Sequence, residues 1–166
     1  TPTWFGMLTD EGALTEAVDA MQYAWTGEWP ATRTPVVETI RLDGRTASES
    51  VVLAEGQDYE AVFDVVDPQG DALAYRWEIK AESTATTGGG DFEAPIESIE
   101  GLLSEAASAR TTLTAPGPGK YRLFAYASDE GGRVAHANIP FRVEEEFRQE
   151  AEALLEGEVM AMSYSG

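Results

Sequence analysis

The chain has 166 residues, 43% of them hydrophobic and 10% aromatic, which is typical of a folded globular protein. It carries 30 acidic against 11 basic residues, for a formal net charge of −19, and this negative field disfavours nucleic acid and anionic membranes as partners. The sequence has no run of about 18 apolar residues of the kind that predicts a membrane span. The absence of cysteine excludes disulfides and thiolate metal sites. The acidic, lysine-poor composition fits two explanations, ordinary solubility and a halophilic adaptation to high salt.

Residues 1–29 predict one strand and one helix. An apolar strand over 4–8 is followed by a turn and by a helix over 13–25, with Gly27 where a helix C-terminal glycine belongs. The helix has an apolar stripe, formed by Leu14, Val18, Met21 and Trp25. Because a lone strand and helix cannot bury this stripe, we expect another part of the protein to cover it.

Residues 57–80 predict the centre of a β-sheet protein. Apolar and polar residues alternate on both sides of a turn over 67–71 that contains proline and glycine. Trp77 lies in the middle of the second alternating run, and a tryptophan there is typical of the core of a β-sandwich. We therefore expect Trp77 to pack against Phe63 and Leu123.

The remaining pattern predicts further strands, two helices and a loop. Strands are expected at 36–42, 50–53, 110–115, 121–127 and 134–143, helices at 96–107 and 144–157, and a polar loop at 83–90. The glycines of this loop are not followed by the Gly-Lys-Ser/Thr of a phosphate-binding loop.

Two parts of the chain resemble parts of known families. The first 29 residues, WFGMLTDEG and the helix after it, resemble the closing strand and last helix of a (β/α)8-barrel glycoside hydrolase. This resemblance implies that the chain is the C-terminal end of a larger sugar-cleaving enzyme, secreted or held in the cell envelope. The catalytic carboxylates of such barrels lie on earlier strands, so no catalytic residue is assigned here.

Residues 35–143 resemble the PKD-like and immunoglobulin-like modules of secreted carbohydrate enzymes, because DPQGDALAYRW is followed by PGKYRLFAYASDEGG. The resemblance implies that Tyr121 is the corner tyrosine, whose hydroxyl bonds back to the backbone. The expected fold is mainly β, an immunoglobulin-like sandwich of the PKD or fibronectin type with an N-terminal strand–helix segment and a short C-terminal helix. The expected divisions are a barrel end or helical appendage at 1–29, a linker at 30–35, the sandwich at 36–143 and an acidic helical tail at 144–166.

A calcium site is one candidate, because two acidic turns are expected at the same end of the sandwich. Carboxylates from both turns could surround one cation, namely Asp64, Asp67, Asp71, Asp129 and Glu130. Alternatively, aspartates in turns cap backbone amides.

Aromatic residues give a second candidate, a surface for carbohydrate or for a neighbouring domain. If Leu123 faces the core, then Arg122, Phe124 and Tyr126 face outward, where they would stack on sugar rings or contact the catalytic barrel. Trp25 and Trp29 could join such a contact, or tie the helix to the sandwich.

Catalysis by this chain is not expected. The single histidine, His136, lies on a predicted strand without a Gly-x-Ser-x-Gly nucleophile motif. The leading hypothesis is a non-catalytic accessory module that braces the barrel of a glycoside hydrolase and contacts polysaccharide. The alternative is a surface adhesion or assembly module stiffened by calcium; a small hydrolase is a third possibility, and would cleave glycans by itself.

Overall fold

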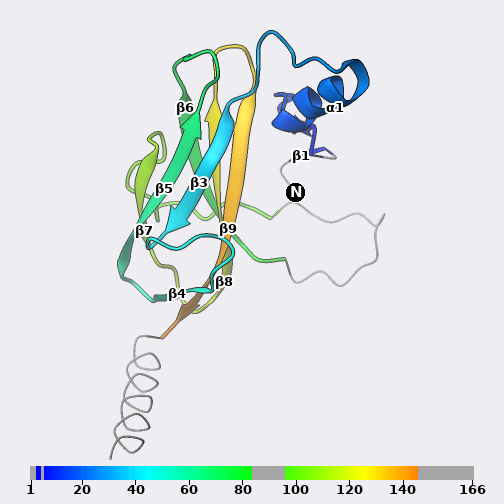
Figure 1. Ribbon diagram of the computed structural model, residues 1–166. Coiled ribbons are helices and arrows are strands. Elements are labelled where there is room, and N and C mark those ends of the chain that lie inside the picture. The colour runs from blue at the N-terminus through cyan, green and yellow to red at the C-terminus, as the bar shows by residue number, and fades with distance from the viewer. Residues whose placement is uncertain (1–2, 5, 84–95, 146–166) are drawn as a thin grey trace, which may run out of the picture.

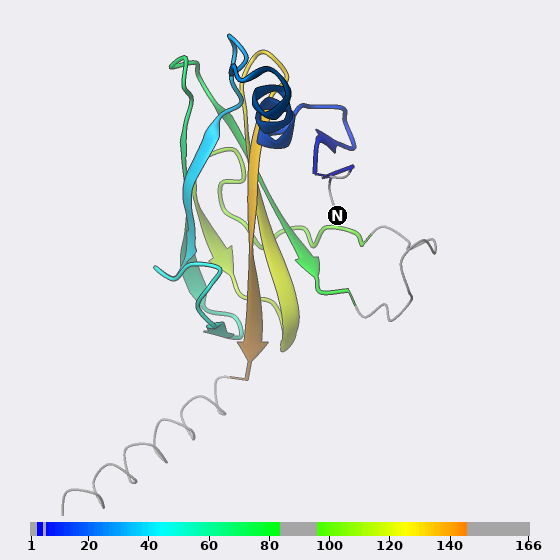
Figure 2. The same ribbon diagram turned by 45° about the vertical axis from the view of Figure 1, so that its right-hand side comes forward.

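The computed structural model describes residues 3–4, 6–83 and 96–145. Two β-sheets face each other as a sandwich (Figures 1 and 2). The first sheet has the order β3-β5-β7, with β3 at Val36–Leu42, β5 at Asp58–Val66 and β7 at Arg110–Thr114. The second has the order β4-β9-β8-β6, with β4 at Val51–Ala54, β9 at Val134–Glu144, β8 at Gly119–Ser128 and β6 at Ala74–Ala81.

All strand pairs in the two sheets are antiparallel except β4 and β9, which run parallel. The predicted mainly β fold and sandwich are confirmed, and each strand lies within two residues of its predicted position.

The core lies between the sheets and is centred on Trp77, as predicted. The Trp77 side chain is 3% exposed, and its ring meets the ring of Phe63 edge to face at 6.0 Å between centroids. Its indole Nε1 donates a hydrogen bond of 2.8 Å to the carbonyl oxygen of Ser108. Leu123 belongs to the same buried cluster.

Two local predictions at the ends of strands also hold. The turn between β5 and β6 places Gly70 at a φ of 79°, a conformation that glycine adopts at little cost. The hydroxyl of Tyr121 donates a hydrogen bond of 2.8 Å to the carbonyl oxygen of Gly117, the bond of a corner tyrosine.

The helix predicted over 96–107 is wrong. This segment is an extended strap across one side of the sandwich: the Ile99 N–H donates to Ile79 of β6, and the Thr114 N–H of β7 donates to Leu102. It therefore satisfies exposed backbone groups on the edge strand of each sheet. Its apolar side chains, spaced as on a helix, pack instead against the edge of the core. The predicted loop from 84 onward and the tail helix from 146 onward lie outside the described residues.

The N-terminal residues form a small unit beside one end of the sandwich (Figure 1). β1 at Thr3–Trp4 pairs with β2 at Leu8–Thr9, so the single strand predicted over 4–8 is a hairpin. α1 spans Glu16–Thr26 and ends at Gly27, whose φ of 76° and N–H bond to Tyr23 confirm the predicted cap. No helix among the described residues has the length and apolar character needed to cross a membrane.

Candidate functional site

A buried carboxylate fixes the N-terminal unit to the sandwich. Asp19 is the one buried residue of α1 and is only 1% exposed. Its Oδ2 accepts a hydrogen bond from the N–H of Thr34 at 2.6 Å, and its Oδ1 accepts one at 2.8 Å from the guanidinium of Arg133, the residue just before β9. We call Asp19, Thr34 and Arg133 the anchor. A buried network of charge-assisted hydrogen bonds holds its elements in one arrangement, because leaving any of its groups buried without a partner would lower the free energy of unfolding.

Backbone contacts reinforce the anchor. The Leu14 N–H donates to Gly132 at 3.1 Å, and the Val134 N–H donates to Leu14 at 2.8 Å, so the chain before α1 runs as an extra bridge beside β9. This explains why the helix begins at Glu16 and not at residue 13. In the segment 30–35, expected as a linker, Thr34 and Pro35 are fully buried.

Three aromatic side chains in or just after the last turn of α1 are exposed. Trp25 is 77% exposed, Tyr23 46% and Trp29 43%, and they are three of the five exposed large hydrophobic side chains in the described part of the chain. Exposed apolar side chains that adjoin one another mark interaction surfaces, whereas single ones are common on any protein surface. The expectation that Trp25 ties the helix to the sandwich is therefore wrong, since its side chain points into solvent.

The exposed aromatic residues lie on two different sides of α1. Tyr23 and Trp25 are two residues apart, which separates them by about 200° around a helix. Trp25 continues the side of Val18 and Met21, both half-buried, and we call these three residues the outer face.

On the other side, Tyr23, Trp29 and Arg33 form what we call the aromatic stack. The Tyr23 and Trp29 rings are 4.5 Å apart and inclined by 19°, and the Arg33 guanidinium carbon is 3.9 Å from the Trp29 ring centroid. The Arg33 N–H donates to the side-chain oxygen of Gln69 at 3.0 Å, which joins the stack to the β5–β6 turn. The stack is thus held in place at both ends, by α1 and by the sandwich.

The aromatic pair expected on the outer face of β8 is not exposed to solvent. Tyr126 is only 2% exposed, because the Arg76 guanidinium lies 4.1 Å from its ring centroid. Burial raises the pKa of its hydroxyl well above the ordinary value of 10, and the Glu78 carboxylate beside it adds to this effect. Phe124 is half-buried.

Arg122 is also engaged and not available as an isolated cation. Its guanidinium bonds both carboxylate oxygens of Glu82, at 2.9 and 3.2 Å, and the side-chain oxygen of Asn138 at 2.7 Å. Alternation therefore placed these β8 side chains on the correct face, but charged neighbours cover that face.

The structure does not assemble the expected calcium ligands into one site. Asp67 Oδ1 accepts the N–H groups of Gln69 and Asp71, and Asp129 Oδ1 accepts that of Arg133, so both aspartates cap their own turns. Within 3–4, 6–83 and 96–145, no group of three or more His, Cys, Asp or Glu could hold a metal ion. This corrects the grouping expected for Asp64, Asp67, Asp71, Asp129 and Glu130.

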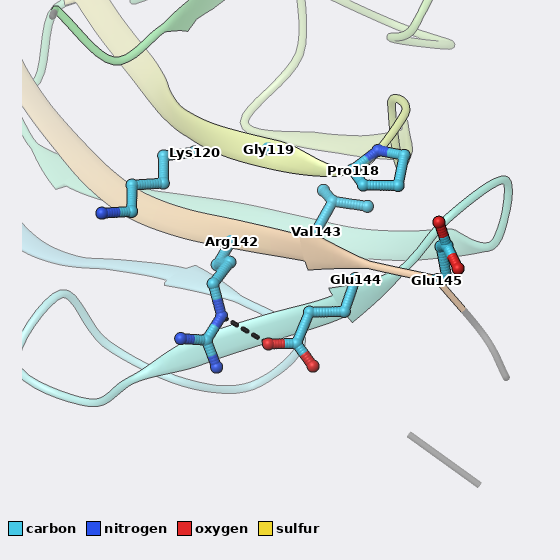
Figure 3. A pocket seen from close by; sticks show the side chains of 7 residues that line it. All are labelled: Pro118, Gly119, Lys120, Arg142, Val143, Glu144 and Glu145. Atoms are coloured by element: carbon cyan, nitrogen blue, oxygen red, sulfur yellow. Dashed lines mark ion pairs between the residues drawn. The ribbon is translucent and has the colours of Figure 1, made fainter. Parts of the chain in front are cut away.

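A shallow pocket of about 280 Å³ lies at the opposite end of the sandwich, which sequence reasoning did not single out. Figure 3 shows it between the ends of β8 and β9, lined by Pro118, Gly119, Lys120, Arg142, Val143, Glu144 and Glu145. Arg142 is paired with Glu144 at 2.7 Å, so the charges in the pocket are largely balanced. Its lining contains no serine, threonine, cysteine or histidine.

Comparisons with known proteins give weak likenesses only. No protein-family model matches the chain, and no curated protein matches it. Similar solved structures include a nucleoside hydrolase-related hypothetical protein from Saccharophagus degradans, associated with carbohydrate metabolism, with 17% identity and a TM-score of 0.48 over 76% of this chain and 29% of that one. This chain thus spans less than a third of that protein's length.

The PKD domain of the KIAA 1837 protein shows 18% identity and a TM-score of 0.34 over 60% and 84% of the two chains. The copper resistance protein PcoC from Escherichia coli shows 13% identity and a TM-score of 0.37, over 66% of this chain and 99% of that one. The assignment of a sandwich rests on this chain's own sheet order and core.

Proposed function

We propose that this chain is a non-catalytic accessory module of a secreted carbohydrate-cleaving enzyme, which braces the catalytic domain and contacts polysaccharide. The observation that carries the proposal is the outer face, a partly apolar helix side with a largely exposed tryptophan on an element fixed to the sandwich by a buried anchor. A fixed apolar surface transmits orientation from one domain to the next, which a flexible linker cannot do.

The place of β1 is compatible with a partner in the same polypeptide. β1 lies next to α1 (Figure 1), so a domain attached ahead of it would be tethered close to this helix. A tether supplies a high effective concentration, and a small surface then suffices for a stable contact. The resemblance of residues 1–29 to the end of a glycoside hydrolase barrel favours a catalytic domain as that partner.

The chemistry of the described residues supports a non-catalytic role. His136 is half-buried beside the Tyr126 ring, at 6.5 Å between centroids, and burial lowers its pKa. The pocket at the other end of the sandwich contains paired charges. The pocket lining has no serine, threonine, cysteine or histidine, and so it offers no hydroxyl or thiol nucleophile activated by a histidine.

The test uses the full polypeptide encoded by the gene, with Trp25→Ala as the variant. In the 166-residue chain alone, Trp25→Ala should leave the melting temperature nearly unchanged, because the side chain is already 77% exposed. In the full polypeptide it should separate the unfolding of the catalytic domain from that of the sandwich in calorimetry. An upstream sequence without a catalytic domain, or joint unfolding that survives Trp25→Ala, would refute the proposal; tandem copies of the sandwich would favour the adhesion module.

A further inference from the structure

We infer that the aromatic stack of Tyr23, Trp29 and Arg33 is a contact site for a neutral polysaccharide. The inference rests on the proposed function, because it names the residues and the class of glycan through which the module would contact polysaccharide. It concerns the side of α1 opposite to the outer face, so the two surfaces can be occupied at the same time and tested separately.

The first support is the apolar area that remains in water after the rings have stacked. Tyr23 and Trp29 still expose 46% and 43% of their surface, although each already covers part of the other. The electron-rich faces of aromatic rings attract weakly positive hydrogens, such as those on the C–H faces of sugar rings. Two half-exposed rings in contact therefore match a ligand with apolar faces and polar edges.

The second support is that the stack is already ordered before any ligand binds. Arg33 holds Trp29 by a cation–π contact of 3.9 Å and is fixed to Gln69 through its backbone N–H. The next residue, Thr34, is locked by Asp19 in the anchor. Little conformational freedom would thus be lost on binding, and this allows a small aromatic surface to bind a glycan measurably.

Charge decides which class of glycan fits. The chain has a net charge of −19, and α1 has no basic residue in its last turn, so Arg33 is the one cation of the stack itself. Exposed Gln22 and Glu28 border the stack in sequence and can hydrogen-bond sugar hydroxyls. Polyanionic glycans would be repelled by this field, whereas neutral chains would not.

The experiment measures depletion of the 166-residue chain from solution by insoluble cellulose, chitin and xylan, with an alginate gel as the anionic control. We expect retention on at least one neutral polymer and none on alginate at low salt. Tyr23→Ala should weaken retention by about tenfold or more, the loss typical of truncating an aromatic hot-spot residue. Tyr23→Phe keeps the ring and should bind as the wild type does.

Trp25→Ala is the matched control, since it removes a more exposed aromatic side chain from the other side of the same helix and should leave retention unchanged. Circular dichroism confirms that each variant is folded. Failure of the wild-type chain to bind any of the three neutral polymers, or equal losses for Tyr23→Ala and Trp25→Ala, would overturn the inference. Because the bracing contact is tested through Trp25 in the full polypeptide, either proposal can fail without the other.

Discussion

Trp77 is the residue on which the sandwich depends most. Its side chain fills the space between the sheets against Phe63 and donates its N–H to Ser108, so Trp77→Ala would leave both a cavity and an unpaired carbonyl oxygen. We expect a loss of about 3–5 kcal/mol in the free energy of unfolding, a large part of the roughly 5–15 kcal/mol usual for a domain. Urea denaturation monitored by circular dichroism measures this loss.

Arg76, the preceding residue on the same strand, provides the matched control. Its side chain is half-exposed, pairs with Glu78 and covers the Tyr126 ring, so Arg76→Ala should cost about 1 kcal/mol or less. Equal losses for the two substitutions would contradict the position of the core.

His136 makes stability depend on pH in the weakly acidic range. Burial lowers its pKa in the folded protein below the ordinary 6.5, so the unfolded chain takes up the proton first as the pH falls. The contribution of His136 to stability is therefore constant above about pH 7 and decreases as the pH falls through 6.5. His136→Gln should flatten the dependence of the urea midpoint on pH between about pH 7 and pH 5.5, before the carboxylates titrate. An unchanged slope in the variant would show that other groups cause the dependence.

The burial of a side chain could be predicted from the sequence only where the alternation of apolar and polar residues determines it without other influences. Alternation placed Trp77 in the core correctly, because the face between two sheets is always covered. It also placed Tyr126 on the outer face correctly, yet that side chain is buried. Alternation gives the face on which a side chain lies, whereas Arg76 and the neighbouring charged residues decide what covers that face.

At the scale of elements, the anchor joins α1 to the sandwich. Asp19→Ala would leave the Arg133 guanidinium and the Thr34 N–H without their partner, and breaking a buried ion pair typically costs about 3–5 kcal/mol. We expect residues 6–35 to lose protection from hydrogen exchange while the strands of 36–143 keep theirs. Glu16→Ala removes an exposed carboxylate of the same helix and should change neither region. Full protection of 6–35 in Asp19→Ala would disprove the role of the anchor.

The elements themselves were largely predictable, but their long-range partners were not. The strands and α1 follow from local alternation and spacing, whereas Asp19 meets partners 15 and 114 residues away in the sequence. In the sequence, Asp19 is only a carboxylate beside an apolar stripe, a pattern that exposed helices also show. The segment 96–107 was predicted as a helix for a related reason: its apolar spacing fits a helix, and only the open edges of β6 and β7 favour an extended chain.

At the scale of the whole molecule, the net charge of −19 predicts how ions act on stability. Folding brings these charges together, so salt that screens their repulsion should raise the melting temperature. Calcium and potassium chloride at matched ionic strength should raise it by similar amounts, since the described residues include no set of three ligands and Asp67 and Asp129 already cap their turns.

Chelation separates screening from binding. A site occupied at about a hundred times its Kd would add about 2.7 kcal/mol to the free energy of unfolding, an effect that potassium cannot reproduce and that EDTA reverses. A rise in melting temperature specific to calcium, and lost in Asp67→Asn or Asp129→Asn, would show that the two acidic turns bind the ion after all. Equal effects of both salts would instead show that salt acts on the acidic surface through screening alone. In that case the stability should continue to increase toward molar potassium chloride, as expected for a protein adapted to high salt.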